Sequence, residues 1–187
     1  MIGWLPESAK FFQRLLEEDE GAVDRQRARG CPSCRGRLDR ADYPRKPRGL
    51  PAHWDSLFNR RFSMCCRREG CRRRVTPPSV RFLGRRVHVG AVVLLGATVP
   101  VLVAIALYGA ARCTVARWTA WWTGTLPQSA FWRVARARLM PPVDESRLPA
   151  ELLVRFLGDC DDALFKALAF VAPITAAPRS SSFPMGP

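Results

Sequence analysis

Two short cysteine pairs, Cys31-Pro-Ser-Cys34 and Cys66-Arg-Arg-Glu-Gly-Cys71, limit the folding of this chain more than any other feature. They belong to a group of five cysteines between positions 31 and 71, out of seven in the whole chain. A disulfide framework favours an even number of cysteines and an export signal. Positions 1–21 contain several charged residues and no apolar signal core. The pattern therefore indicates a cluster of reduced cysteines that binds a metal.

The metal best suited to these pairs is a single structural zinc ion. Zn²⁺ takes four ligands in a tetrahedron, and two short cysteine loops can supply all four. Because four cysteines fill the coordination shell, no position remains open for catalysis. Cys65 is an alternative to Cys66, since adjacent residues of a strand point to opposite faces, but Cys66 closes the tighter loop. We therefore predict these ligands: Cys31, Cys34, Cys66 and Cys71.

The charge of the chain is concentrated around the same cysteines. The chain has 30 Lys and Arg residues against 16 acidic residues, a formal net charge of +14. Positions 25–86 alone contain 19 basic and 4 acidic residues. So basic a block indicates a polyanionic partner, either nucleic acid or an anionic membrane. The arginines around the cysteine pairs are suited to phosphate contacts; they are Arg35, Arg37, Arg67, Arg68, Arg72, Arg73 and Arg74. The DNA-binding residues predicted in this block are Arg72, Arg73, Arg74, Arg85 and Arg86.

The longest apolar segment, 89–111, has 23 uncharged residues, which is enough to cross a bilayer. Gly90, Gly96 and Gly109 interrupt it, and Pro100 would break a helix near its middle. We therefore expect two short helices, about 87–97 and 101–108, both buried in a small helical domain. A single membrane span at 89–111, with tryptophans at its edge, is the alternative.

A helix-turn-helix is predicted at 102–118. Such a motif needs a small residue where its helices cross, and Ala104 or Ala106 would serve. Gly109 suits the turn because it tolerates a positive φ. In the second helix, Val115 and Trp118 would face the core. The outward side chains predicted to enter a major groove are Arg112, Thr114 and Arg117.

The remaining elements follow from hydrophobic periodicity and from breaker residues. We expect an amphipathic helix at 4–20 that stops at Gly21, and strands at 60–64 and 73–76. Further helices are predicted over these ranges: 112–122, 128–140, 149–157 and 161–171. The predicted fold is mainly α with a small β zinc ribbon, in which a ribbon with four cysteine ligands is followed by a helical helix-turn-helix domain.

Five segments make up the predicted domain organisation. They are an N-terminal amphipathic helix (1–24), a basic zinc-ribbon domain (25–86), a helix-turn-helix domain (87–140), C-terminal helices (141–177) and a disordered tail (178–187). The tail is rich in serine and proline, which favours disorder.

The combination of a CPxC…C-x4-C ribbon with the segment YGAARCTVARWTAWW resembles the DNA-binding part of bacterial insertion-sequence transposases. It is also similar to small accessory proteins encoded beside them. The resemblance covers about 30–122 and implies the zinc ligands and recognition-helix residues named above. The chain departs from the family pattern at Ala111 and Cys113. No segment can form the nuclease core of a transposase, so we expect no enzymatic activity.

The leading hypothesis is a non-catalytic DNA-binding protein of a bacterial mobile element that assists or regulates transposition. Its partners would be double-stranded DNA, a transposase encoded nearby and a second copy of the chain, and its location the cytoplasm, associated with the nucleoid. The residues leave two other functions open. One is a single-pass membrane protein with a basic cytoplasmic zinc domain, and the other is a zinc-ribbon adaptor for protein interactions.

Overall fold

A computed structural model describes residues 9–50, 56–83, 88–156 and 158–176 of the chain. It is mainly helical and has a small sheet. The elements, in chain order, are α1 (Ala9–Arg29), β1 (Leu38–Arg40), β2 (Tyr43–Pro44), η1 (Ser56–Asn59), β3 (Arg60–Arg61), β4 (Met64–Cys66), β5 (Arg74–Val75), α2 (Gly90–Gly96), α3 (Val101–Tyr108), α4 (Arg112–Ala120), η2 (Trp121–Thr125), α5 (Ala130–Ala135), η3 (Arg136–Arg138), η4 (Glu145–Arg147), α6 (Ala150–Arg155), α7 (Cys160–Val171) and η5 (Ala172–Ala176).

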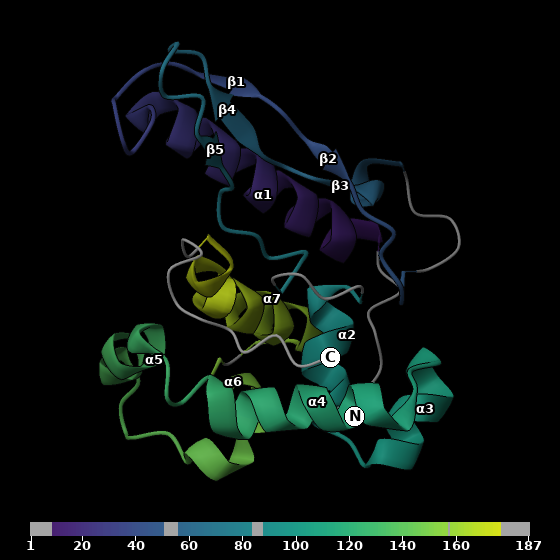
Figure 1. Cartoon of the computed structure of the whole chain (residues 1–187). Coiled ribbons are helices and arrows are strands. Elements are labelled where there is room, and N and C mark those ends of the chain that lie inside the picture. The colour runs from purple at the N-terminus through teal and green to yellow at the C-terminus, as the bar shows by residue number, and fades with distance from the viewer. Residues whose placement is uncertain (1–8, 51–55, 84–87, 157, 177–187) are drawn as a thin grey trace.

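The elements form successive layers (Figure 1). The strands and α1 make up one end of the molecule, and α4 lies at the other end. Between them, α1 contacts α7, α7 contacts α2, and α2 contacts α4. One continuous set of buried apolar side chains, from Phe11 in α1 to Ala172 in η5, runs through these layers.

The cysteine-bearing end contains a three-stranded antiparallel sheet in the order β1-β4-β5. Leu38 pairs with Cys66, and Met64 pairs with Val75. Met64 and Cys66 are buried while Cys65 between them is only half-buried, as the alternation of a strand requires. A second antiparallel pair joins β2 to β3. The predicted strand at 73–76 forms as the shorter β5. The predicted single strand at 60–64 is wrong, because β3 ends at Arg61 and β4 begins only at Met64, continues to Cys66 and belongs to the other sheet.

Helix α1 extends to Arg29, so the predicted stop at Gly21 is wrong. Buried side chains continue on both sides of Gly21, from Phe12 and Leu16 to Val23. A glycine inside a helix costs only about 1 kcal/mol relative to alanine, and this packing outweighs it. The helix passes through position 24, the predicted boundary with the zinc-ribbon segment, and ends before Gly30, which has a φ of 73°.

A buried ion pair ties α1 to the segment that leaves the sheet. Asp19 and Arg81 are almost completely inaccessible to solvent, and the Arg81 Nε donates to the Asp19 carboxylate at 2.8 Å. The same carboxylate accepts hydrogen bonds from the Ser79 hydroxyl at 2.6 Å and the Val80 backbone N–H at 2.7 Å. The Arg81 guanidinium also lies 4.2 Å from the ring centre of Phe62. A buried charge is tolerated only when it is paired in this way.

The predicted division of 89–111 into two helices is confirmed, but only α2 is buried. Every residue of α2 is inaccessible, whereas in α3 only Ala104 is. Leu102 is 77% exposed and Val103 is 42% exposed, so the prediction that both helices are buried is wrong for α3. Among the described elements, α3 packs mainly against α4 and α2, and its side chains on the opposite face are exposed.

The same region was also the candidate for a single membrane span. Within the described ranges, no single helix is long and apolar enough to cross a bilayer. Only α3 taken together with Arg112–Thr125 reaches the necessary length and composition, and that pair is bent by 118°.

The C-terminal half forms the predicted helices: α6 is shorter than the predicted 149–157, and α7 matches the predicted 161–171 to within one residue. The predicted helix at 112–122 changes after Ala120 into a π-helical turn, η2. The predicted helix at 128–140 begins at Ala130, where the Ser129 hydroxyl accepts from the Trp132 N–H, and it tightens into η3 after Ala135. The predicted tail at 178–187 lies outside the described residues.

Candidate metal centre and DNA-binding helices

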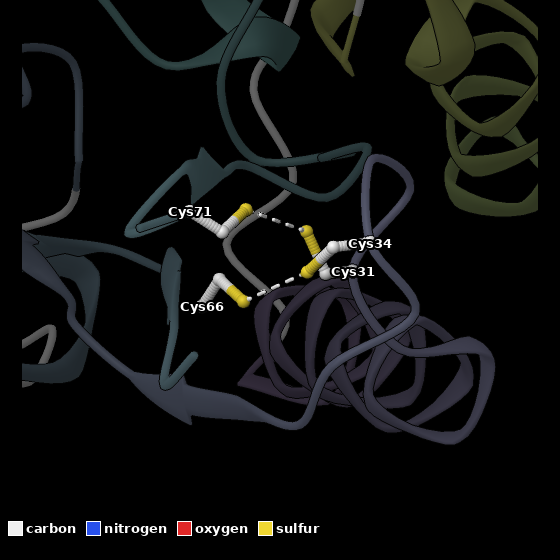
Figure 2. A group of neighbouring side chains, drawn as sticks. All are labelled: Cys31, Cys34, Cys66 and Cys71. Atoms are coloured by element: carbon white, nitrogen blue, oxygen red, sulfur yellow. Dashed lines mark hydrogen bonds between the residues drawn. The ribbon is translucent and has the colours of Figure 1, made fainter. Parts of the chain in front are cut away.

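Four cysteine side chains converge at one edge of the sheet (Figure 2). Cys31 and Cys34 lie in the loop that follows α1, Cys66 ends β4, and Cys71 lies in the loop before β5. Their sulfur atoms all lie within 4.8 Å of one another. The Sγ atoms of Cys31 and Cys71 are 3.7 Å apart, and those of Cys34 and Cys66 are 3.4 Å apart.

These separations fit a single tetrahedral ion. Zinc–sulfur bonds of about 2.3 Å in a regular tetrahedron place the sulfurs about 3.8 Å apart. The four cysteines grouped from the sequence thus form one cluster, and the cluster is compatible with one metal ion. Cys65 is not part of it, because its thiol turns away and lies 3.4 Å from the Arg72 carbonyl oxygen.

Backbone N–H groups point at the sulfurs. The N–H groups of Ser33 and Cys34 donate to the Cys31 sulfur and lower the pKa of its thiol to about 6. Burial instead raises the pKa of the Cys66 thiol to about 12, against the opposing hydrogen bond from the Arg68 N–H. Burial thus favours the protonated form of Cys66, and a bound divalent ion would be needed to hold all four cysteines as thiolates.

The two loops turn in the same way. Arg35 and Arg72 each follow the second cysteine of a pair, and they are the two described non-glycine residues with positive φ, at 59° and 42°. At Gly36, a Cβ atom would lie 3.2 Å from the Cys66 sulfur and 3.3 Å from the Cys34 sulfur. The first loop therefore favours glycine there, because a larger side chain would press on two sulfurs of the cluster.

Arginines surround this cluster, and several face solvent. Arg72 and Arg73, both predicted phosphate contacts, are exposed. Arg74 is exposed too, but it donates to the Ala41 carbonyl at 2.8 Å and to the Ser63 hydroxyl at 3.2 Å, which holds it against the sheet. Arg85 and Arg86 lie outside the described residues.

Two arginines beside the cluster were not singled out from the sequence. Arg27 and Arg29 occupy the last turn of α1, directly before the first cysteine loop, and both are exposed. The predicted helix ended at position 20, which separated these residues from the helix that positions them. The continuing apolar periodicity at Ala22 and Val23 was the signal that could have placed them.

Helices α3 and α4 are joined by a tight turn. Gly109 ends α3 in the left-handed region, with φ 61° and ψ 22°, and its N–H donates to the Ile105 carbonyl. Only Ala110 and Ala111 separate Gly109 from α4, and the chain direction changes by 118°. Ala111 provides no side-chain cap for α4.

The inner faces of these two helices bury the residues predicted to face the core. Ala104, rather than Ala106, is the buried small residue of α3. Val115 and Trp118 are the buried residues of α4. The Trp118 ring approaches α2 so closely that a Cβ added at Gly96 would lie 2.7 Å from it.

The outer face of α4 carries the predicted groove-reading side chains. Arg112 and Arg117 are exposed, and Thr114 is half-buried. The Arg117 guanidinium folds back onto its own helix, with its Nε 3.3 Å from the Cys113 carbonyl and its Nη2 3.3 Å from the Thr114 hydroxyl. Both contacts are long for hydrogen bonds to a cationic donor, so a stronger acceptor can replace them.

Comparisons of this chain with protein-family models, with curated proteins and with solved structures found no match.

Proposed function

We propose that this chain is a non-catalytic DNA-binding protein that holds one structural zinc ion and reads a major groove through α4. The observation that carries the proposal is the pair α3–α4. These two short helices meet at 118° across a turn of a few residues. The turn contains a left-handed glycine, and the first helix buries an alanine. Such dimensions are typical of a helix-turn-helix. Arg112 and Arg117 on the outer face of the second helix supply donors for base edges and phosphates.

Zinc has a folding role in this proposal. The strands around the cysteines are only two or three residues long, and strands this short need support from outside the sheet. Zinc bound to the thiolates of Cys31, Cys34, Cys66 and Cys71 would join the loop after α1 to both ends of the β4–β5 connection. Removing it is expected to unfold that end of the molecule first.

The arginines around the zinc loops would contact phosphates. Such contacts add affinity without base preference and make binding depend on salt. Arg72 and Arg73 are free to do this, whereas Arg74 would first have to leave Ala41 and Ser63. The resemblance to transposase DNA-binding segments supports a mobile-element context, with a cytoplasmic location and a transposase or a second copy as further partners.

One observation favours a second candidate function, which is binding to an anionic membrane surface. The uncharged α3 exposes Leu102 and Val103 to solvent, and an apolar helix beside arginines is also suited to an anionic bilayer. Sedimentation with vesicles containing anionic lipid tests this function, and the Leu102→Gln variant should abolish co-sedimentation if the function is real.

Selection of binding sites from random duplexes tests the DNA-reading proposal. Arg117→Ala should flatten the base preference at the positions it reads, at a cost of about 1–3 kcal/mol per lost base contact. Arg73→Ala should instead weaken binding to all sequences alike. Arg133→Ala removes an exposed arginine from α5 and serves as the matched control. Equal losses on selected and random DNA for Arg117→Ala would refute a groove-reading role for α4.

A further inference from the structure

The molecule has two separate basic surfaces. The knuckle surface is defined here by four exposed arginines of the two cysteine loops: Arg35, Arg68, Arg72 and Arg73. The α4 surface comprises Arg112 and Arg117. Across the described ranges, no carboxylate pairs with any of these six arginines. Both surfaces therefore present unneutralised positive charge to solvent.

These surfaces lie at opposite ends of the fold. The cysteine loops project from the far end of α1, and α4 forms the opposite edge of the molecule (Figure 1). The successive contacts from α1 to α7, from α7 to α2 and from α2 to α4 place intervening helices between them. Packed helix axes are about 8–10 Å apart, so the two surfaces are separated by on the order of 20 Å of packed protein.

Acidic residues predominate along part of α1 and along α7, which connect the two ends of the molecule. Residues 9–24 of α1 together with α7 contain seven acidic and three basic residues. Among the acidic ones, Glu17, Glu20 and Asp24 are exposed. A straight duplex that ran from one basic surface to the other along α1 and α7 would pass these carboxylates, which would repel its phosphates.

From this arrangement we infer that one copy of the chain binds two duplex segments at once, one on the knuckle surface and one on the α4 surface. The inference rests on the proposed DNA-binding function and adds a bridging role to it. The knuckle surface would bind any sequence through phosphates, and the α4 surface would select the sequence of the second segment.

A capture experiment tests the bridging role. A random-sequence duplex is fixed to beads, the full zinc-loaded chain is added, and retention of a second, fluorescent random-sequence duplex is measured. A monomeric bridge predicts retention that rises and then falls with protein concentration, because excess protein occupies the two duplexes separately. Sedimentation of the protein alone establishes its oligomeric state under the same conditions.

Paired variants separate the two surfaces. R72A/R73A removes charge from the knuckle surface, and R112A/R117A removes it from the α4 surface. K10A/R60A removes two exposed basic residues outside both surfaces and serves as the matched control. Zinc content and circular dichroism check that each variant is folded.

Four outcomes are distinguishable. Bridging by one copy predicts that each surface variant still binds one duplex within about tenfold of the original affinity but retains the second duplex only at background level, while the control behaves as wild type. If either surface variant still retains the second duplex, two copies hold it and the inference is wrong. If the wild type binds DNA without capture, the inference fails and the proposed function stands. If the wild type binds no DNA, both fail.

Discussion

Loss of the Asp19 carboxylate should destabilise the whole chain far more than loss of any exposed acid. Asp19 is 1% exposed and accepts three hydrogen bonds, of 2.6, 2.7 and 2.8 Å, from the hydroxyl of Ser79, the N–H of Val80 and the Nε of Arg81. Asp19→Ala would leave a buried guanidinium without its carboxylate and two neutral donors without this acceptor. Breaking a buried ion pair from one side costs about 3–5 kcal/mol, a large part of a total stability of about 5–15 kcal/mol.

Urea unfolding at a fixed excess of zinc measures this loss. The control is Asp24→Ala on the same helix, since Asp24 is exposed and should change the free energy of unfolding by no more than about 0.5 kcal/mol. Replacing both partners in Asp19→Leu/Arg81→Met should recover most of the loss, because an apolar pair of similar volume leaves no buried charge. A loss below about 1 kcal/mol for Asp19→Ala would show that the pair does not hold α1 in place.

Three further predictions concern other positions. Gly36→Ala should weaken zinc retention against a chelator, because its Cβ would lie 3.2 and 3.3 Å from two sulfurs of the cluster, whereas Gly124→Ala, with open space around it, should not. Gly96→Ala should lower the midpoint of urea unfolding by the equivalent of about 1–3 kcal/mol, since Trp118 must move; an unchanged midpoint would contradict the close packing. Burial, assisted by Arg48, lowers the pKa of His88 below its usual 6.5. As the pH falls, His88 therefore takes up a proton in the unfolded chain before it does so in the folded chain. The contribution of neutral His88 to stability is fully present above pH 6.5 and is lost as the pH drops through 6.5 toward the folded-state pKa. His88→Phe should flatten this part of the stability–pH curve, and a curve unchanged by the substitution would exclude His88 as its origin.

The features that the sequence predicted correctly depend on short-range spacing. The sequence allowed the four cysteines to be grouped because two short cysteine pairs at this spacing are typical of one shared metal site. They are Cys31, Cys34, Cys66 and Cys71. The turn between α3 and α4 could be placed because a left-handed position favours glycine, and Gly109 occupies it. Each of these inferences uses only a few neighbouring residues and the geometry they allow.

The features that the sequence missed depend on contacts between distant segments. Gly21 is a reasonable helix stop by itself, but packing of Phe12 and Val23 carries α1 past it. The exposure of α3 could not be predicted from periodicity, because a helix that is apolar on all sides has no pattern to mark its outer face. The pairing of Asp19 with Arg81 joins residues 62 positions apart, and no local signal identifies it.

The zinc-loaded chain's affinity for a random duplex at two salt concentrations tests the central claim most directly. If about four phosphates are contacted, the logarithm of the binding constant falls with the logarithm of salt at a slope of about −3.6. Between about 50 and 200 mM salt the affinity should then drop about 150-fold. Fluorescence anisotropy of a labelled duplex measures this drop in protein shown to carry one zinc ion. An affinity that does not change between these salt concentrations, or no binding at either of them, would contradict the proposal that this chain binds DNA.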